Sequence, residues 1–510
     1  MSVRIAGLPG VALLLLLAAQ PALVAAQSTP DPQAPASTED RLRRLEQRQQ
    51  QLEEELKKKD AEIQQLKGAP AQPGAGTAAP AVPSSPPDAG GPGTAAAQDA
   101  APAITDAAPA PAPTSRVGTY TPQFGFTVVD GPQGDMNISL FTYVRYLNQK
   151  GLESTYTNYF GKTTPIQERQ DVQLNKVQLR FLGWAFDPKF RYFLYAWSSN
   201  TSQGQGAQVV LGGNLNYTFN RYFTLSGGIA GLPAVRTLEG QFPNWLSVDN
   251  RLMADEFFRP GYTSGIWARG QITDNVRYQI MVGNNMSQLG VSSARLDNHF
   301  DTVATALVWE PTGDYGIGFG DFENHETLSS RLGTHFLHST EDKESQPNTD
   351  QFENTQIRLS DGTIVFTPNI FGPGVMINTL QVLMEDVDFG LKYRGWSLEG
   401  EYYFRQLNQF SGPGTGTLPH IDNNGFSLWV SDMIVPRFMQ LYVGGSRISG
   451  DYGNPWETRF GVNVFPYKNK VIRWNTQLIY VDRAAAGNAT IPYPVGGKGF
   501  TFNTDLEMAL

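Results

Sequence analysis

The sequence predicts an all-β fold, a transmembrane antiparallel β-barrel of about 16–18 strands that follows a short α-helical coiled coil and a disordered linker. Polar Lys176, Gln178 and Arg180 alternate with apolar Val177 and Leu179, and successive strand side chains point to opposite faces. The same unit recurs through residues 117–510, with tight turns alternating with long polar loops. The chain has 510 residues and no Cys, so stability must come from burial and closure of the sheet.

Residues 1–26 have the pattern of a cleaved signal peptide. Arg4 precedes an apolar run at 11–19, and Val24-Ala25-Ala26 stands before Gln27. This apolar run is too short to span a bilayer. We expect an exported chain that begins near Gln27, with residues 27–37 as a short N-terminal tail.

A heptad pattern covers residues 38–67 and predicts a periplasmic coiled coil. Six of its eight core positions are apolar, and a single copy would leave that seam in water. The core positions are Leu42, Leu45, Gln49, Leu52, Leu56, Lys59, Ile63 and Leu66. Self-association into a homo-oligomer is favoured, with a trimer as the guess, and a solitary solvated helix is the alternative. Residues 68–116 are rich in Pro, Ala and Gly and are predicted to be a disordered linker.

Seven short segments within residues 117–510 read as tight turns: 187–189, 220–221, 273–275, 311–314, 394–395, 436–437 and 467–469. Long polar connections separate these hairpins and are expected outside the cell: 151–171, 198–207, 232–263, 284–299, 321–356, 406–424 and 482–498. The number of strands within residues 363–384 cannot be assigned from the sequence pattern. The alternation over residues 500–510 predicts a final strand, which we expect to close the barrel against residues 124–129.

Three segments carry a resemblance to a known family. They are the hairpin from Val177 to Gly183 with Asp187-Pro188, the block at 228–233 with the long loop to Arg259-Pro260-Gly261, and the strand at 474–480. With the coiled-coil preface, residues 117–510 resemble the phosphate-selective porin O and P family of Gram-negative outer-membrane channels. The resemblance implies sixteen strands, frequent trimers and loops that fold inward.

The net charge of the predicted barrel, residues 117–510, does not indicate a channel dedicated to anions. Removing the ten basic and twelve acidic residues of 1–116 from totals of 39 and 48 leaves 29 and 36, a net charge of −7. Acidic residues crowd the predicted external loop 321–356, at Asp321, Glu323, Glu326, Glu341, Asp342 and Glu344. Selectivity therefore depends on local placement of charge. Basic residues on the polar strand faces are the pore-lining candidates: Lys176, Arg180, Arg277, Lys392, Arg394, Arg405, Arg459 and Arg473. They form either an anion path or a hydrated wall paired with carboxylates.

The loop at 232–263 is long enough to narrow a wide lumen. Leu252, Met253 and Phe257 at helical spacing predict one short helix within it. Its charged residues are the constriction-loop candidates: Arg236, Arg251, Asp255, Glu256 and Arg259. The alternative is a loop that caps the outer surface.

The sequence gives little indication of a metal-binding or catalytic site. His325, His335, His338 and Glu326 match no zinc template, so no metal site and no cofactor are predicted. The carboxylates of residues 385–388 lack a nucleophile or base partner, and no GxSxG element is present, so the chain is not expected to be an enzyme. A mildly acidic chain also argues against nucleic acid as a partner.

Together these patterns predict a passive outer-membrane porin for small hydrophilic solutes and ions, among them anions such as phosphate, with outer-membrane lipid around it. A carbohydrate-selective channel is one alternative, since tryptophans could form a stacking track, although aromatic girdles at the membrane boundaries explain them better. Those residues are Trp184, Trp197, Trp267, Trp309, Trp396, Trp429 and Trp474. A structural barrel that anchors the membrane to the cell wall through the coiled coil is the other alternative.

Overall fold

The computed structural model describes residues 116–199, 208–240, 242–287, 291, 295, 300–347, 355–487 and 490–510. The predicted signal peptide (1–26), tail (27–37), coiled coil (38–67) and all but the last residue of the linker (68–116) lie outside the described residues. None of the helices in the described part of the chain is long and apolar enough to cross a membrane.

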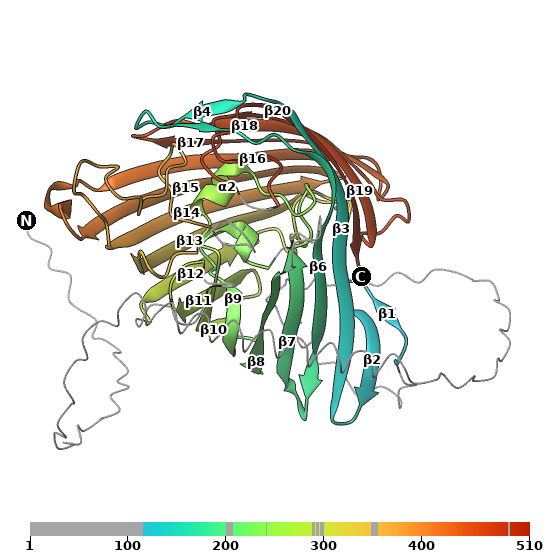
Figure 1. Cartoon of the computed structure of the whole chain (residues 1–510). Helices are drawn as coiled ribbons and strands as arrows, with labels where there is room; N and C mark the ends of the chain where they lie inside the picture. The colour runs from blue at the N-terminus through green and yellow to red at the C-terminus, as the bar shows by residue number, and fades with distance from the viewer. Residues whose placement is uncertain are drawn as a thin grey trace, which may run out of the picture. The chain divides into compact units, whose positions relative to one another are not determined.

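Sixteen antiparallel strands form a closed barrel (Figure 1), at the lower bound of the predicted count. Each pairs with its neighbours along the chain, as a repeated hairpin pattern requires. The strands are β3 (Gly134–Leu152), β6 (Gln170–Ala185), β7 (Asp187–Ser199), β8 (Gln208–Asn220), β9 (Phe223–Gly231), β10 (Tyr262–Thr273), β11 (Val276–Gly283), β12 (Thr302–Trp309), β13 (Ser329–Asp342), β14 (Thr379–Tyr393), β15 (Trp396–Ser411), β16 (Ile421–Val435), β17 (Met439–Gly450), β18 (Trp456–Val464), β19 (Ile472–Asp482) and β20 (Gly499–Ala509).

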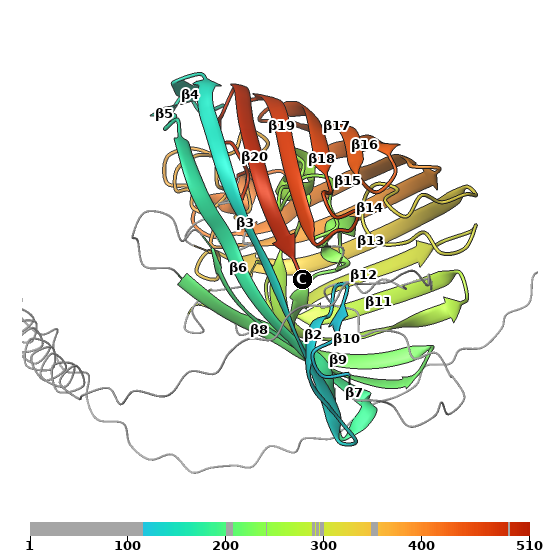
Figure 2. The same ribbon diagram turned by 90° about the vertical axis from the view of Figure 1, so that its right-hand side faces the viewer.

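The barrel closes between β20 and β3, which lie side by side in Figure 2. Gly499 pairs with Leu152, and Ala509 pairs with Phe141. The predicted closing partner at 124–129 was wrong. Those residues belong largely to β2 (Gly125–Gly131), which pairs with the first residues of β3 and also with β1 (Tyr120–Thr121). Strands β2 and β20 pair with the same edge of β3, β2 at residues 134–138 and β20 at residues 141–152. Strand β2 therefore continues the sheet beyond the end of β20.

The connections fall into two classes at the two ends of the barrel. Turns of one to seven residues join β6 to β7, β8 to β9, β10 to β11, β14 to β15, β16 to β17 and β18 to β19. We call this the short-turn end and the opposite one the long-loop end. Five predicted turns lie within or overlap these connections, whereas the turn predicted at 187–189 lies instead at Phe186, which has a φ of 62°.

A turn is present at 311–314, where the Gly313 N–H donates to the Glu310 carbonyl, but it does not close a hairpin, because residues 310–328 form a long connection between β12 and β13. The external acidic loop predicted at 321–356 was wrong. Its centre, Ser329–Asp342, is strand β13, and both Asp321 and Glu341 are buried. The long connection at this place is 343–378.

The outer face of the barrel is apolar. On β13 and β14, Leu332, Val387 and Phe389 are exposed, whereas Arg331 and Asp388 on the alternate face are buried. Trp309, Trp396 and Trp474 are also exposed, as predicted for boundary aromatics, but Trp197, Trp267 and Trp429 are buried. An apolar outside and a polar inside are the pattern of a transmembrane barrel.

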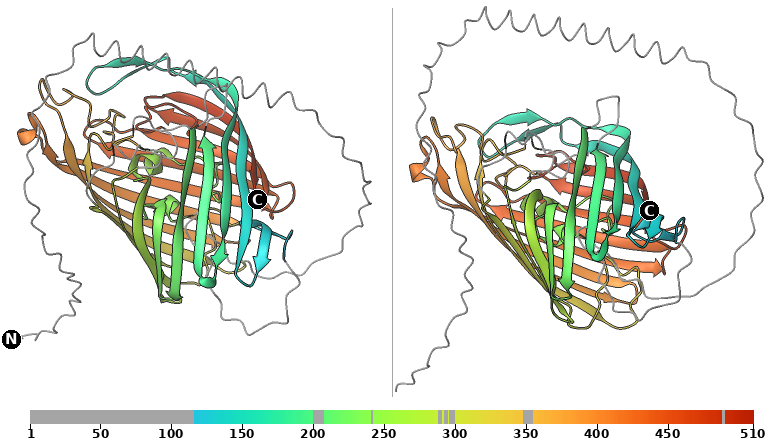
Figure 3. Two further views of the ribbon diagram at one scale, coloured as in Figure 1. Left: turned by 60° about the horizontal axis from the view of Figure 1, so that its bottom comes forward. Right: turned by 90° about the horizontal axis from the view of Figure 1, so that it is seen from below.

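Segments from the connections fill much of the interior. The β9–β10 connection carries η2 (Arg236–Leu238) and α2 (Met253–Phe258), and α2 contacts β15, β16, β17 and β18. Figure 3 shows α2 inside the ring of strands. Apolar residues of this connection share one core with wall residues and with parts of the 343–378 and 483–498 connections. At the long-loop end lie β4 (Thr155–Thr157), β5 (Thr163–Pro165) and η4 (Thr415–Thr417).

Candidate functional site

Residues 232–261, which we call the inserted loop, place every constriction-loop candidate inside the barrel. Arg236, Arg251, Asp255, Glu256 and Arg259 are all buried. The loop folds inward because its apolar side chains find partners there: the Phe258 ring stacks on Tyr403 of β15 at 5.0 Å, with an interplanar angle of 7°. The predicted short helix is α2, Met253–Phe258, and the alternative of an outer cap is excluded for these residues.

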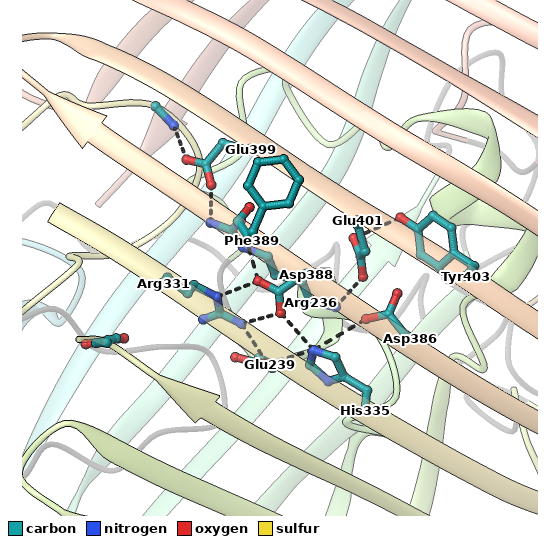
Figure 4. A network of polar contacts seen from close by, with 12 residues as sticks. Arg236, Glu239, Arg331, His335, Asp386, Asp388, Phe389, Glu399, Glu401 and Tyr403 are labelled. Carbon is teal, nitrogen blue, oxygen red and sulfur yellow. Dashed lines mark hydrogen bonds and ion pairs between the residues drawn. The ribbon is translucent and has the colours of Figure 1, made fainter. Parts of the chain in front are cut away.

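One polar network attaches the start of the inserted loop to β13, β14 and β15 (Figure 4). The Arg236 backbone N–H donates to Glu401 at 2.8 Å, and its guanidinium lies 2.5 Å from Glu399. Arg331 bonds Asp388 at 2.8 Å and reaches Glu239 of the loop at 2.9 Å. Buried ions need such pairing, because an uncompensated charge inside a protein is costly.

A second set of contacts holds residues 243–251 against β3, β6, β18, β19 and β20. Lys176 pairs with Asp249 at 2.7 Å. Inward side chains donate to four backbone carbonyls of the loop: Arg145 to Val248 at 2.9 Å, Arg473 to Trp245 at 2.5 Å, Asn463 to Leu246 at 2.9 Å and Arg459 to Arg251 at 3.0 Å. The strand wall therefore supplies donors that satisfy loop carbonyls away from water.

Helix α2 carries two carboxylates with different surroundings. Glu256 forms an ion pair with Arg259 at 2.6 Å. Asp255 accepts a hydrogen bond from Thr237 at 2.8 Å, but burial and the nearby Glu401 carboxylate raise its pKa to about 8. The inserted loop thus contains an acid that takes up a proton within the neutral pH range.

The 310–328 connection reaches the inserted loop from the short-turn end. The Phe319 N–H donates to the Asn244 carbonyl at 3.0 Å. Asp321 accepts from the Gly395 N–H at 2.8 Å and from the His325 ring at 2.5 Å. The hydrogen bond to Asp321 raises the pKa of His325. Burial acts to raise the pKa of Asp321, but the hydrogen bonds from the His325 ring and from the Gly395 and His325 N–H groups together lower it.

The long-loop end of the interior is packed. Ile357, Leu359 and Val365 of the 343–378 connection are buried, as are Ala484 and Ile491 of the 483–498 connection. Two contacts tie these segments to the wall. Arg405 donates to the Arg358 carbonyl at 2.6 Å, and Tyr493 donates to Glu457 at 3.0 Å.

Solvent reaches the inward face mainly on β7, β10 and β11, toward the short-turn end. The inward residues Arg191, Arg269, Arg277 and Gln279 are partly accessible, and Gln271 is exposed. Across β7–β11 the sequence contains four basic residues and one acidic residue, Asp187, which directly follows a turn. We call this wall the basic sector.

The pore-lining candidates divide into three groups. Lys176, Arg180, Lys392, Arg405, Arg459 and Arg473 are buried on the inward side rather than lining open water. Arg277 also faces inward, with a side chain that is 41% exposed. Arg394 was placed wrongly, because it lies exposed in the β14–β15 turn with a φ of 47°.

Sequence analysis did not single out Arg145, Arg191, Arg269 or Arg331. Arg191 and Arg269 stand at inward positions of alternating strands, so the same alternation could have found them. Arg331 lies in β13, which the acidic residues Glu341 and Asp342 made resemble a loop.

Comparisons with known proteins are limited to distant structural likeness. No protein-family model matches the chain, and no curated protein sequence matches it. An anion-selective porin from Comamonas acidovorans matches with 10% identity and a TM-score of 0.46, over 74% of this chain and 100% of its own. The outer-membrane channel DcaP of Acinetobacter baumannii matches with 8% identity and a TM-score of 0.43, over 75% and 99%. OprB of Pseudomonas putida matches with 9% identity and a TM-score of 0.41, over 74% and 94%.

Proposed function

We propose that this chain is a passive outer-membrane channel for small hydrophilic solutes and ions, with its long-loop end outside the cell. The closed sheet and apolar outer face support a position in the membrane, because no strand edge remains unpaired in hydrocarbon. We expect no catalysed chemistry, and membership of the phosphate-selective porin O and P family remains part of this proposal.

The basic sector is the observation that carries the proposal, and we infer a preference for anions such as phosphate from it. Arg191, Arg269 and Arg277 face inward where the wall is accessible, and Glu239 and Glu310 of the adjoining connections pair with Arg277. Fixed positive charge on an accessible wall favours anions regardless of the net charge of the chain. The net charge of −9 is therefore compatible with an anion path.

Reversal potentials in planar bilayers test this proposal. With potassium chloride at different concentrations on the two sides, the native protein should prefer chloride. Replacing Arg191, Arg269 and Arg277 by Glu together should shift the reversal potential toward potassium, because the sign of the lining charge changes. The matched control is Arg394→Glu, the same charge change in an exposed turn. Equal reversal potentials for the triple variant and the native protein would refute the anion path.

A carbohydrate channel is a second candidate, and an aromatic row on β7 favours it. Phe193, Tyr195 and Trp197 follow one another on the inward face, with ring centroids 5.6 Å and 6.3 Å apart. Tyr195 and Trp197 are buried, so Phe193 is the partly accessible ring of this row on which a sugar could stack. Malto-oligosaccharide should then interrupt the ion current in a concentration-dependent manner, and Phe193→Ala should weaken the interruption.

A membrane anchor is a third candidate, favoured by the packed long-loop end. We propose that residues 38–67 self-associate, with a trimer as the working assignment, and that they lie in the periplasm. A folded protein without conductance would support the anchor. Conductance that survives deletion of residues 38–67, together with loss of the oligomer in cross-linking, would support a pore whose coil serves assembly.

A further inference from the structure

Four side chains converge at one point between the inserted loop and the barrel wall (Figure 4). His335 stands on β13, Asp386 and Asp388 stand on β14, and Glu239 follows η2 in the loop. The His335 Nε2 atom lies 3.0 Å from Asp388 Oδ2, 3.4 Å from Glu239 Oε1 and 3.5 Å from Asp386 Oδ1. Ligand atoms of Glu239, His335 and Asp388 lie within 4.8 Å of one another, and Asp386 lies beside His335.

The second ring nitrogen of His335 fixes which tautomer faces this centre. Nδ1 lies 3.3 Å from the Pro233 carbonyl oxygen, which can only accept a hydrogen bond. Nδ1 therefore carries a proton, and a bound cation would take the place of the proton that Nε2 donates to Asp388 Oδ2 at 3.0 Å. Histidines that bind metals have this arrangement, with the distal N–H donated to a carbonyl or carboxylate.

Asp386 supplies an independent reason to expect a ligand. Its side chain is buried, and neither of its oxygens has a hydrogen-bond partner in the described part of the chain. The neighbouring Glu401 is already satisfied by the Arg236 N–H and the Tyr403 hydroxyl, each at 2.8 Å. A buried carboxylate in this state requires a proton or a cation.

The spacing and the charge fit a divalent transition-metal ion. Tetrahedral ligands at 2.0–2.1 Å from zinc lie roughly 3.3 Å from one another, close to the separations around Nε2. Arg331 orients Asp388 and Glu239 by hydrogen bonds to their carboxylates, as outer residues of metal sites do. The carboxylates of Glu239, Asp386 and Asp388 with one Arg331 leave two negative charges, because Arg236 is shared between Asp388 and Glu399 and Arg277 between Glu239 and Glu310. A divalent ion balances the two charges.

We propose that Glu239, His335 and Asp388 bind a divalent transition-metal ion such as Zn²⁺, with the Asp386 carboxylate beside them adding negative charge. Glu239 belongs to the inserted loop and the other two ligands to the wall, so the ion cross-links the loop to β13 and β14. Sequence analysis set His335 aside because its neighbours in the chain, His325 and His338, suggested no template. The true ligands come from β14 and from a loop almost one hundred residues earlier.

Zinc binding to the full, untagged chain in detergent tests the proposal. After treatment with a chelator, isothermal titration with Zn²⁺ and elemental analysis should give one ion per chain. Asp386→Asn and His335→Gln should each lower the affinity by about tenfold or more. The matched control is His338→Gln. His338 lies three residues further along β13, on its outward face, so this variant should bind zinc like the native chain. Circular dichroism and heat-dependent gel mobility confirm folding of each variant.

A measurement on the native chain tests the proposed site even if substitution of a buried ligand prevents folding. Diffraction at the zinc absorption edge should place an anomalous peak between Glu239, His335 and Asp388. No stoichiometric zinc, or equal affinity in the Asp386→Asn variant, would overturn the proposal and assign the centre to an imidazolium or a proton shared between carboxyl groups. Neither result bears on the bilayer measurements, so failure of this site and failure of the proposed channel are distinguishable.

Discussion

The Lys176 ammonium lies 2.7 Å from the Asp249 carboxylate, and both side chains are buried between β6 and the inserted loop. The ammonium also lies 4.4 Å from the ring centroids of Trp197 and of Phe242. One cation therefore joins the barrel wall to the loop by an ion pair and two aromatic faces. This contact explains why a basic residue at an inward position need not line open water.

Replacing Lys176 by Met should destabilise the folded barrel, because it removes the cation that pairs with the buried Asp249 carboxylate. The expected loss is about 3–5 kcal/mol in the free energy of unfolding, the range for breaking a buried pair. Denaturant unfolding in detergent measures it. Lys189→Met removes an exposed lysine and should cost little. The double variant Lys176→Met with Asp249→Leu should recover much of the loss, and no recovery would show that the pair itself is not the cause.

Gly461 makes room for the Tyr442 ring across the β17–β18 pair. A Cβ atom on Gly461 would lie 2.1 Å from the ring, whose hydroxyl accepts a hydrogen bond from Asn475 at 2.8 Å. Gly461→Ala should therefore destabilise the barrel by about 1–3 kcal/mol through overpacking. Thermal unfolding should show a lower midpoint for this variant than for Gly416→Ala, where the added Cβ meets nothing within 4 Å. Equal midpoints would mean that the ring moves without cost.

The barrel architecture can be predicted from the local alternation of polar and apolar residues. The packing of loop segments inside the barrel cannot be predicted in this way. On β14, Leu380, Val382 and Met384 face inward against the inserted segments, with Gln381 and Glu385 on the opposite face. This reverses the usual pattern of polar inside and apolar outside, so strand counting failed at 363–384. Similarly, the ligand-like cluster around His335 depends on the register of β13 against β14 and on Glu239 of the inserted loop, and no local pattern in the sequence indicates either.

The pair of His325 and Asp321 should stabilise the 310–328 connection at acidic pH rather than alkaline pH. The hydrogen bond that the His325 ring donates to Asp321 raises the pKa of His325 above its usual 6.5. Burial opposes ionisation of Asp321, but this bond and the backbone N–H bonds together lower its pKa below the usual 3.8. The histidine contribution is therefore full below about pH 6.5 and is lost as the pH rises through the raised value. Native protein should exceed His325→Gln in melting temperature at pH 5.5, and the difference should shrink by pH 8.5. A pH-independent difference would contradict this.

Asp255 should make the barrel less stable as the pH rises toward 8. Burial and the Glu401 carboxylate raise its pKa from 3.8 to about 8, although Arg251 and the Thr237 hydroxyl act in the opposite direction. The folded chain then holds a proton that the unfolded chain has released, so stability falls between about pH 4 and pH 8. Asp255→Asn should flatten this part of the profile of unfolding free energy against pH. A profile as steep as that of the native chain would assign the proton to another group.

A disulfide can test whether the packed long-loop end must move for conduction. The chain has no Cys, so a pair introduced at Gly450 on β17 and Ser360 in the 343–378 connection has no competing thiol. A Cβ on Gly450 would lie 3.0 Å from the Ser360 Cβ, slightly less than the roughly 3.5–4.5 Å of a disulfide.

If ions pass only when this connection leaves the lumen, the oxidised double variant should show no conductance in planar bilayers, and a reductant should restore it. Gly450→Cys and Ser360→Cys alone are the matched controls and should conduct in both conditions. Equal conductance of the oxidised pair and the single variants would mean that ions pass along the basic sector without displacement of the connection. Absence of conductance in every variant and in the native chain would instead favour the membrane anchor over the channel.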